Sequence, residues 1–457
     1  MIGKSEVEAA LKVNTAASSE MAEAISLWSA MYADSPPWKS ETVSTFNLPA
    51  TISSKFAKMV TLEAECTLTG SPRAEWLAQQ LKPVQCNLRS FVELAAAKGG
   101  LVFKPFIHNG GIVVDAVQAD RFFPTSFDGN GFVTGGIFLA QTTVGRDIYT
   151  RLEWHGFEKN RYRVTNQAYK SSHGGTLGKL IPLSEVPDWA EIQPETWING
   201  LAHPLFSYFK MPQANNVDAS SPLGASVFSR AVNTIEQVDR QYSRFLWEFE
   251  GGELAVHASA DMFKAKPESK HGEVELPEGK KRLYRALDGS IEPGRNLFET
   301  YAPAFRDQSL LNGFNALLRL VEQQSGLAYG TISNPMEVDK TATEIISSKQ
   351  ESYSTVSDIQ NSLENALLSL VESMDALATA GNLCPRGNYK IAFTWDDSII
   401  VDKQAERQRF WNYVAAGKFP FWKYLVDFEG YTEDDAKAIQ GEMSQELGDP
   451  YAEPGIS

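Results

Sequence analysis

The chain has 457 residues, of which 43% are hydrophobic and 11% aromatic, a composition typical of ordered globular proteins and not of disordered ones. This length exceeds what one compact core accommodates, so we expect two to four substructures. The formal net charge of −15 argues against nucleic-acid binding through a general basic surface, because such binding requires clustered lysine and arginine.

The sequence lacks several features that would indicate a membrane, secreted or nucleotide-binding protein. No apolar run approaches the roughly 18 residues that a membrane span needs, and the N-terminus has no signal-peptide core, so we expect a protein kept inside a cell. Cys66, Cys86 and Cys384 are odd in number and scattered, which argues against a disulfide framework or a cysteine metal site. No P-loop, dinucleotide fingerprint or HExxH motif occurs, so no cofactor is expected.

Three regions near the N-terminus have helical patterns. Pro36 and Pro37 should end the first region, and Pro83 should break or kink the third. The expected helical regions cover residues 1–40, 52–68 and 72–98.

From Leu101 the pattern changes to the alternation typical of strands. A turn at residues 108–111 joins two strands into a hairpin, and a second turn at residues 128–131 precedes three further strands. We therefore expect an antiparallel meander, in a region of the α+β class that closes near residue 214.

Two helices follow, separated by a small insertion. In the first helix, apolar residues recur three and four apart in a heptad-like seam, and Gly251 and Gly252 end it. Residues 253–303 mix lysine, arginine, proline and glycine with short strands, as expected for a small inserted module. The apolar seam consists of Phe228, Ala231, Ile235, Val238, Tyr242, Phe245 and Phe249, and the second helix has Leu311, Phe314, Leu318 and Val321 on one face.

The stretch from Gly326 to Leu377 begins as a turn-rich loop and becomes a helix that is long for a globular domain. Weak helix formers between Ile346 and Ser357 predict a kink there. One face of this helix carries Val356, Ile359, Leu363, Ala366, Leu370, Met374 and Leu377.

The C-terminal part begins with a strand near residues 388–400. Short helices follow, which Gly417 and Pro420 should interrupt, with Thr432 as the cap of one of them. The last ten residues are expected to be disordered.

Several motifs, taken in order along nearly the whole chain, resemble phage portal proteins of the group found in tailed phages of Gram-positive bacteria. The motifs are LWSAMYADSPPW, AAAKGGLVFKPFIHNGGIVVDAVQADRFFPTSFDGNG, MPQANNVDASSPLGASVFSRAVNTIEQVDRQYSRFLWEFEGGE, DKTATEIISSKQESYSTV and TWDDSIIVDKQAERQRFWNYVAAGKFPFWKYL.

The resemblance implies a portal fold of the α+β class. It would contain a mixed α/β wing, a two-helix stem, a small β-rich clip, a long kinked tunnel helix and a C-terminal helical crown, which is short in this sequence. The implied boundaries are wing 1–220, first stem helix 221–252, clip 253–302, second stem helix 303–332, tunnel loop 333–341, long helix and return to the wing 342–402, and crown and tail 403–457.

The resemblance also implies a non-enzymatic function. Portal proteins form a homo-oligomeric ring, usually twelve-fold in the virion, at one vertex of the capsid, and are assembled in the host cytoplasm. Double-stranded DNA passes through the ring during packaging and ejection without sequence-specific contacts. The expected protein partners are the terminase large subunit, a head–tail adaptor, and the major capsid or scaffolding protein, with no membrane.

Three sets of residues become candidate sites under this resemblance. Each set also fits an ordinary turn or a solvated surface. The tunnel-loop set is Asn334, Pro335, Met336, Glu337, Val338, Asp339 and Lys340; the inter-subunit stem set is Arg240, Arg244 and Glu248; and the clip set, for partner docking, is Lys264, Lys266, Lys280, Lys281 and Arg282.

One rival hypothesis comes from clustered carboxylates at Asp396, Asp397 and Asp402. Such a cluster could hold Mg²⁺ in a metal-dependent nucleic-acid-processing enzyme. However, adjacent residues of a strand point to opposite faces and no histidine lies near in sequence, so helix capping or solvent exposure fits these acids better, and no metal site is expected.

Overall fold

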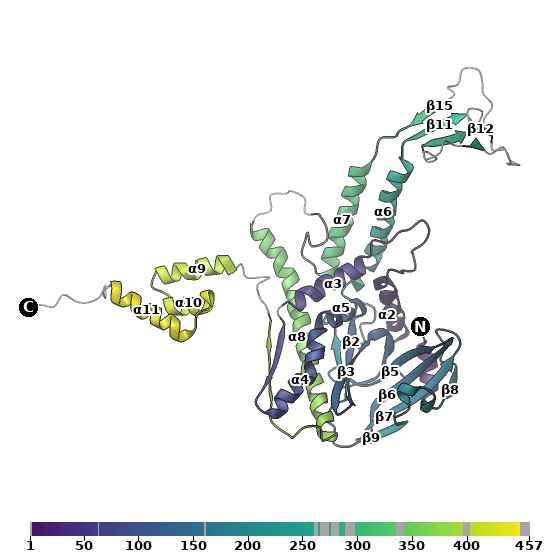
Figure 1. Cartoon of the computed structure of the whole chain (residues 1–457). Coiled ribbons are helices and arrows are strands. Elements are labelled where there is room, and N and C mark those ends of the chain that lie inside the picture. Colours follow the sequence, from purple (N-terminus) through teal and green to yellow (C-terminus); the bar gives the residue numbers. More distant parts are fainter. Residues whose placement is uncertain are drawn as a thin grey trace, which may run out of the picture. The chain divides into compact units, whose positions relative to one another are not determined.

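The computed structural model describes residues 2–62, 64–159, 161–259, 264–265, 274–275, 283–287, 298–334, 342–395 and 403–447. The chain forms two compact units (Figure 1). The larger unit comprises residues 1–339 and 354–394, and the smaller unit comprises residues 340–353 and 395–457. Helices and strands both contribute, as expected for the α+β class.

The N-terminal region is divided differently from the sequence prediction. Its elements are α1 (Lys4–Leu11), α2 (Ser19–Tyr32), α3 (Leu48–Val60), β1 (Glu65–Thr69), α4 (Pro72–Cys86) and α5 (Leu88–Lys98).

All three predicted helical regions need correction. The helix predicted over residues 1–40 is two helices, because Lys12 takes a left-handed conformation and the Ser18 side chain caps α2. The helix predicted over 52–68 ends at Val60, and β1 follows it. The break predicted at Pro83 lies at Asn87, so α4 continues past the proline.

Two antiparallel sheets form the β part of the larger unit. The hairpin of β2 (Gly100–His108) and β3 (Gly111–Gln118) is confirmed, and β10 (Ser207–Lys210) pairs with its other edge in the order β10-β2-β3. The predicted meander is also confirmed, in the order β4-β5-β6-β7-β8 with β9 paired to β7. Its strands are β4 (Phe122–Phe127), β5 (Val133–Val144), β6 (Asp147–Glu158), β7 (Arg161–Ser171), β8 (Lys179–Ile181) and β9 (Glu195–Ile198), and 3₁₀ turns occur at η1 (Ala119–Arg121), η2 (Leu183–Glu185) and η3 (Pro187–Trp189).

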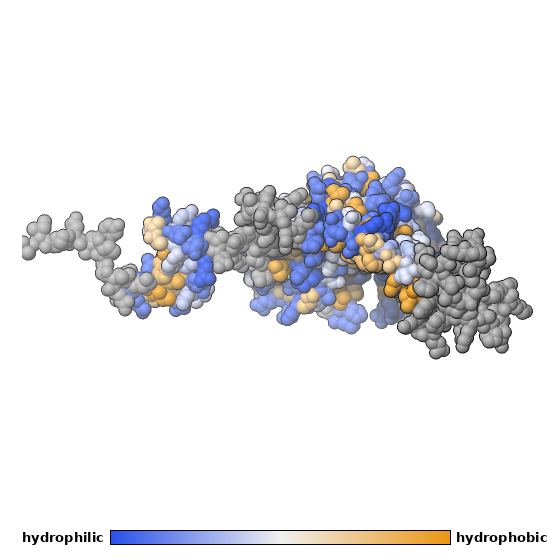
Figure 2. Space-filling view, turned by 90° about the horizontal axis from the view of Figure 1, so that it is seen from above, coloured by the Kyte–Doolittle hydropathy of each residue, from blue (hydrophilic) through white to orange (hydrophobic). Residues whose placement is uncertain are grey.

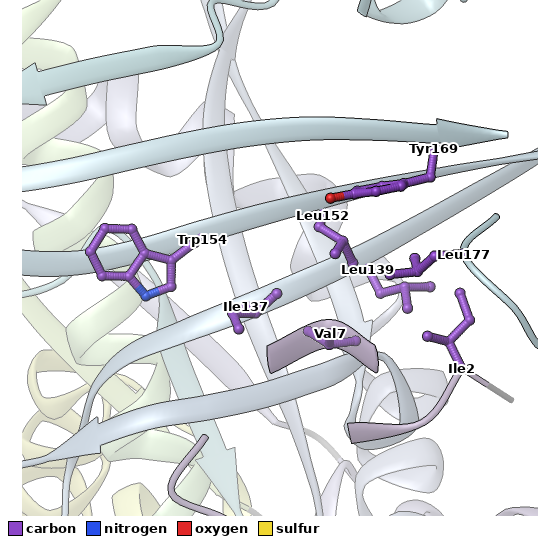
Figure 3. Close-up of a cluster of buried hydrophobic side chains, with 8 residues drawn as sticks. All are labelled: Ile2, Val7, Ile137, Leu139, Leu152, Trp154, Tyr169 and Leu177. Carbon is purple, nitrogen blue, oxygen red and sulfur yellow. The ribbon is translucent and has the colours of Figure 1, made fainter. Parts of the chain in front are cut away.

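Helix α1 covers part of the larger sheet. Val7 is fully buried and Ile2 is nearly so, and both join a hydrophobic cluster with side chains of the sheet (Figure 3). The cluster also contains Leu177 from the connection between β7 and β8, and its strand residues are Ile137, Leu139, Leu152, Trp154 and Tyr169. A second cluster, with Phe122, Phe138 and Phe206 at its centre, lies where the two sheets meet.

Helix α8 (Ala342–Ala380) is one unbroken helix, close to the predicted 341–378, and the kink stays a prediction. All seven apolar residues predicted for one of its faces are buried, which confirms that face. The Ser207 hydroxyl donates to the carbonyl of Ala366, and the Ser362 hydroxyl donates to that of Lys210, so α8 is tied to β10. After α8, β16 (Lys390–Thr394) confirms part of the predicted strand and pairs with β1.

A fully buried arginine joins α4 to the end of α8. The guanidinium of Arg73 donates to the Asp375 carboxylate (2.8 Å), the Asp375 carbonyl (2.6 Å), the Thr379 hydroxyl (2.9 Å) and the Cys384 carbonyl (2.8 Å). Its side chain is 0% exposed, so these four acceptors replace water completely.

A buried polar network links the two sheets. Lys104 on β2 contacts the Glu153 carboxylate on β6 at 2.5 Å, and Arg151 contacts the same oxygen at 3.1 Å. His155 Nε2 lies 2.9 Å from the other Glu153 oxygen, and His155 Nδ1 lies 2.8 Å from the Tyr162 hydroxyl. An ionised carboxylate only accepts, so Nε2 carries the imidazole proton and Nδ1 accepts from Tyr162.

This network should make stability depend on pH. Burial lowers the pKa of His155 from its ordinary 6.5. Burial alone would raise the pKa of Glu153, but Lys104, His155 and Arg151 together hold it well below 4.5.

Acidification from pH 7 is therefore expected to destabilise the chain. As the pH falls below 6.5, the unfolded chain protonates His155 before the folded chain does, so the free energy of unfolding falls by up to about 1.4 kcal/mol per pH unit. Below pH 4.5 the unfolded chain also protonates Glu153 first, which adds to the loss. Urea denaturation at several pH values measures this slope, and His155→Gln should flatten it above pH 4.5; parallel curves would contradict the assignment.

The smaller unit contains the three short helices predicted near the C-terminus: α9 (Lys403–Ala415), α10 (Phe421–Glu429) and α11 (Glu433–Leu447). The Thr432 hydroxyl accepts from the Asp435 backbone N–H, which confirms it as the cap of α11. The Phe410 ring packs against Phe419 and Phe428 and joins α9 to α10.

Candidate functional site

Helices α6 (Val232–Gly251) and α7 (Asp307–Ser325) confirm the two predicted helices. The first begins later than predicted, because the seam residues Phe228 and Ala231 belong to a 3₁₀ turn, η4 (Ser229–Ala231), and its cap. The two helices run side by side in opposite directions (Figure 1). The ring centroids of Phe249 and Phe305 lie 5.5 Å apart at one end of the pair, and those of Tyr242 and Phe314 lie 6.1 Å apart further along.

The helix pair leaves several large apolar side chains exposed to solvent. On α6, Val238 is fully buried, whereas Phe249 at the far end of the same seam is 44% exposed. Trp247, which lies outside the seam, is 68% exposed and is therefore not packed within the chain. Other large apolar residues exposed on or beside the pair are Leu246, Leu254, Tyr301, Phe305, Leu311 and Leu320. Figure 2 shows hydrophobic patches on an otherwise largely hydrophilic surface.

The segment between α2 and α3, residues 33–47, packs against α6 and α7. The Phe46 ring lies 5.2 Å from both Tyr242 on α6 and Phe314 on α7. Asp239 on α6 is 2% exposed and accepts from the Trp38 indole and the Phe46 backbone N–H, each at 2.8 Å. Burial raises the pKa of Asp239. The sequence gave no sign that Phe46 packs against both helices.

The three residues predicted for inter-subunit contacts lie on α6, and each has a partner inside the chain. Arg240 pairs with Glu236 at 2.7 Å, and Arg244 donates to the Gln241 side chain at 3.5 Å. Glu248 accepts from the backbone and guanidinium of Arg306, and these hydrogen bonds lower the pKa of Glu248. Contacts of these residues with another subunit stay a prediction.

A loop of residues 327–334 follows α7 and is held by two residues of that helix. Glu322 is 1% exposed, and its carboxylate accepts from the backbone N–H groups of Gly330 (3.1 Å), Ile332 and Ser333 (2.8 Å), and from the Ser333 hydroxyl (2.8 Å). Asn315 binds the backbone of Asn334 twice, accepting from its N–H at 2.8 Å and donating to its carbonyl at 2.9 Å.

Sequence reasoning missed Glu322. The available signal was its position, because it lies four residues after Leu318 and so shares the buried face of α7. Arg319 also lies at this loop, 5.1 Å from the Tyr329 ring centroid. Its Nε and Nη2 atoms are buried without a hydrogen-bond partner among the residues that the structure describes.

Of the predicted tunnel-loop residues, the structure places Asn334, which is the last residue of this anchored loop. Pro335, Met336, Glu337, Val338, Asp339 and Lys340 lie outside the described residues.

The insertion between α6 and α7 is β-rich, as predicted. In it, β11 pairs in parallel with β14 and antiparallel with β15, and β12 pairs with β13. The strands are β11 (Ala255–Ser259), β12 (Lys264–Ala265), β13 (Val274–Glu275), β14 (Tyr284–Leu287) and β15 (Phe298–Tyr301). Lys264 lies in β12 opposite Glu275, whereas Lys266, Lys280, Lys281 and Arg282 lie outside the described residues.

The carboxylates of the rival hypothesis, Asp396, Asp397 and Asp402, also lie outside the described part of the chain. Within the described part, no group of three or more His, Cys, Asp or Glu residues is placed to hold a metal ion. None of the described helices combines the length and the apolar composition of a membrane span.

Comparison with protein families identifies a match over most of the chain. The model described as "Phage portal protein, SPP1 Gp6-like" matches residues 87–446. The match includes the helix pair, its β-rich insertion, the anchored loop, α8 and most of the C-terminal helices. A search of curated proteins found no match.

Proposed function

Since this chain belongs to the family of SPP1 Gp6-like phage portal proteins, we propose that its copies close into a ring, twelve-fold in the virion, through which double-stranded DNA is packaged and ejected. The chain is thus a virion protein with a role in DNA packaging. We propose that it is not an enzyme and that a separate terminase supplies the ATPase, because the sequence has no nucleotide-binding loop.

The exposed apolar side chains of α6 and α7 carry this proposal. Trp247 is 68% exposed and Leu320 is 47% exposed, although each belongs to a well-formed helix. Exposed apolar patches of this kind are typical of surfaces that bind another protein. In a ring, the same pair in the next copy would cover them, with Arg240, Arg244 and Glu248 at the polar part of the contact.

The parts of the chain take their roles from this arrangement. Residues 1–220 form the wing, 221–252 and 303–332 the stem, 253–302 the clip, 333–341 the tunnel loop, 342–402 the tunnel helix and its return to the wing, and 403–457 the crown. The clip, with Lys264 and the neighbouring lysines and arginine, is proposed to dock the terminase large subunit and then the head–tail adaptor. The crown contacts capsid or scaffolding protein inside the head during assembly in the host cytoplasm.

The proposed channel must let DNA pass without holding it. The net charge of −15 is multiplied by the number of copies, so the ring as a whole repels phosphates. One lysine beside two acids in the segment from Asn334 to Lys340 would touch the DNA backbone weakly and without reading bases.

Native mass measurement of the purified chain tests this proposal. We expect a closed ring of about a dozen copies, and Trp247→Glu should shift most of the protein to monomers or small oligomers, because a buried unpaired charge is costly at an interface. Phe132→Glu is the matched control, since Phe132 is 66% exposed but lies outside the helix pair, and it should leave the ring intact.

Two results would overturn the proposal. A wild-type monomer or dimer that cleaves DNA in the presence of Mg²⁺ would favour the metal-dependent enzyme with Asp396, Asp397 and Asp402. If the Trp247→Glu variant still formed the ring, α6 and α7 would not form the interface between subunits.

A further inference from the structure

The carboxylate of Glu322 is satisfied entirely by the loop that follows its helix. Both oxygens accept from that loop, and no lysine or arginine of the described chain forms an ion pair with this residue. A carboxylate that is 1% exposed would be left without partners if the loop moved away, and that cost opposes separation.

The backbone of the loop is shaped to reach this carboxylate. Gly326 (φ +74°) and Gly330 (φ +81°) both lie in the left-handed region, which glycine enters without strain. The first ends α7 and turns the chain back, and the second brings the following N–H groups toward Glu322. Asn315, nearly two helical turns before Glu322, then fixes the last described residue of the segment, Asn334.

We propose that Glu322 and Asn315 are positioning residues, which hold residues 327–334 as a rigid extension of α7 and so fix the point from which the tunnel loop departs. Residues 327–334 and α7 then move as one rigid body. A displacement of the chain that follows Asn334 therefore displaces α7 as well, because residues 327–334 do not deform. Since α7 connects directly to the β-rich insertion, the two residues couple the DNA-facing segment to the docking end. The DNA-facing part of this inference rests on the proposed function, whereas the rigid attachment does not.

Hydrogen exchange of the assembled full-length protein tests the attachment. Peptides covering residues 327–334 should be protected in the wild type, and Glu322→Gln should speed their exchange about 10- to 100-fold, because the amide puts a donor where the carboxylate accepted. Asn315→Ala should do the same at Asn334, and Asn315→Asp, which keeps the acceptor, should lie in between. Gln324→Ala, at an exposed position of the same helix, is the matched control and should change nothing.

The rate of DNA packaging tests the positioning role, and it is compared among variants whose ring mass and melting temperature equal those of the wild type. Asn315→Ala, which removes only two contacts of a partly exposed residue, should still fold and assemble, and should package DNA several-fold more slowly than wild type or Gln324→Ala. Asn315→Asp should recover part of the rate.

These experiments distinguish the rigid attachment of residues 327–334 from the positioning role and from the proposed function. Wild-type exchange in 327–334 as fast as in an open loop would overturn the rigid attachment. Faster exchange in the variants with unchanged packaging would overturn the positioning role. A wild type that forms no ring would overturn the proposed function, whereas the hydrogen-exchange result would still decide whether residues 327–334 are rigidly attached to α7.

Discussion

Replacing Arg73 by alanine is expected to lower the free energy of unfolding by about 3–5 kcal/mol. The change removes a guanidinium that is 0% exposed and leaves its four acceptors, one of them the Asp375 carboxylate, without a donor. Because these acceptors lie in the last turns of α8 and in the segment after it, the attachment of α4 to this region is lost. Urea denaturation of the purified chain measures the effect.

Arg89→Ala is the matched control for this prediction. Arg89 is exposed and makes one hydrogen bond, to the Thr61 hydroxyl at 3.2 Å, so its loss should change stability by about 0.5 kcal/mol or less. If Arg73→Ala cost as little as this control, the contacts of Arg73 would contribute no net stability.

Replacing Glu153 by alanine is expected to cost about 3–5 kcal/mol as well, for a different reason. The substitution leaves the buried ammonium of Lys104 and the guanidinium of Arg151 without their shared carboxylate, so two positive charges remain close together in the protein interior. Thermal or urea denaturation at pH 7 measures the loss, and adding Lys104→Met to Glu153→Ala should recover part of it, since one of the uncompensated charges is then removed.

The control for Glu153 lies on the same strand. Glu158 pairs with Arg163 at 3.0 Å, but its side chain is 43% exposed, and a pair of this kind contributes about 0–1 kcal/mol. Equal losses for Glu153→Ala and Glu158→Ala would contradict the view that burial makes the network energetically important.

The elements that could be predicted from the sequence are those whose signal is local. The β2–β3 hairpin follows from alternation around one turn, and the buried face of α8 follows from apolar residues three and four apart. Residues 65–68, by contrast, continue a helical pattern, yet they form β1 because β16 supplies a pairing partner more than 300 residues away. A pairing between such distant segments leaves no periodic signal in either one.

The site was predictable to a smaller extent. The helix pair and its β-rich insertion followed from the seam and from the change in composition, and the family resemblance then indicated their roles. Glu322 and Arg73 were missed because a charged residue reads as solvent-exposed unless its partners are known. Those partners are a loop backbone in the first case and the end of α8 in the second, and only the folded chain brings them together.

The packing of Phe46 against α6 and α7 has a consequence for the limits of the family match. The matched range begins at residue 87, yet Trp38, Phe46 and Arg73, which precede it, contact α6, α7 and α8 within that range. We therefore expect the matched range to depend on the preceding residues for its stability. A truncation at residue 87 would remove the Phe46 ring from Tyr242 and Phe314 and would leave the buried Asp239 carboxylate without its two donors, so the N-terminal 86 residues belong in any shortened version of this protein.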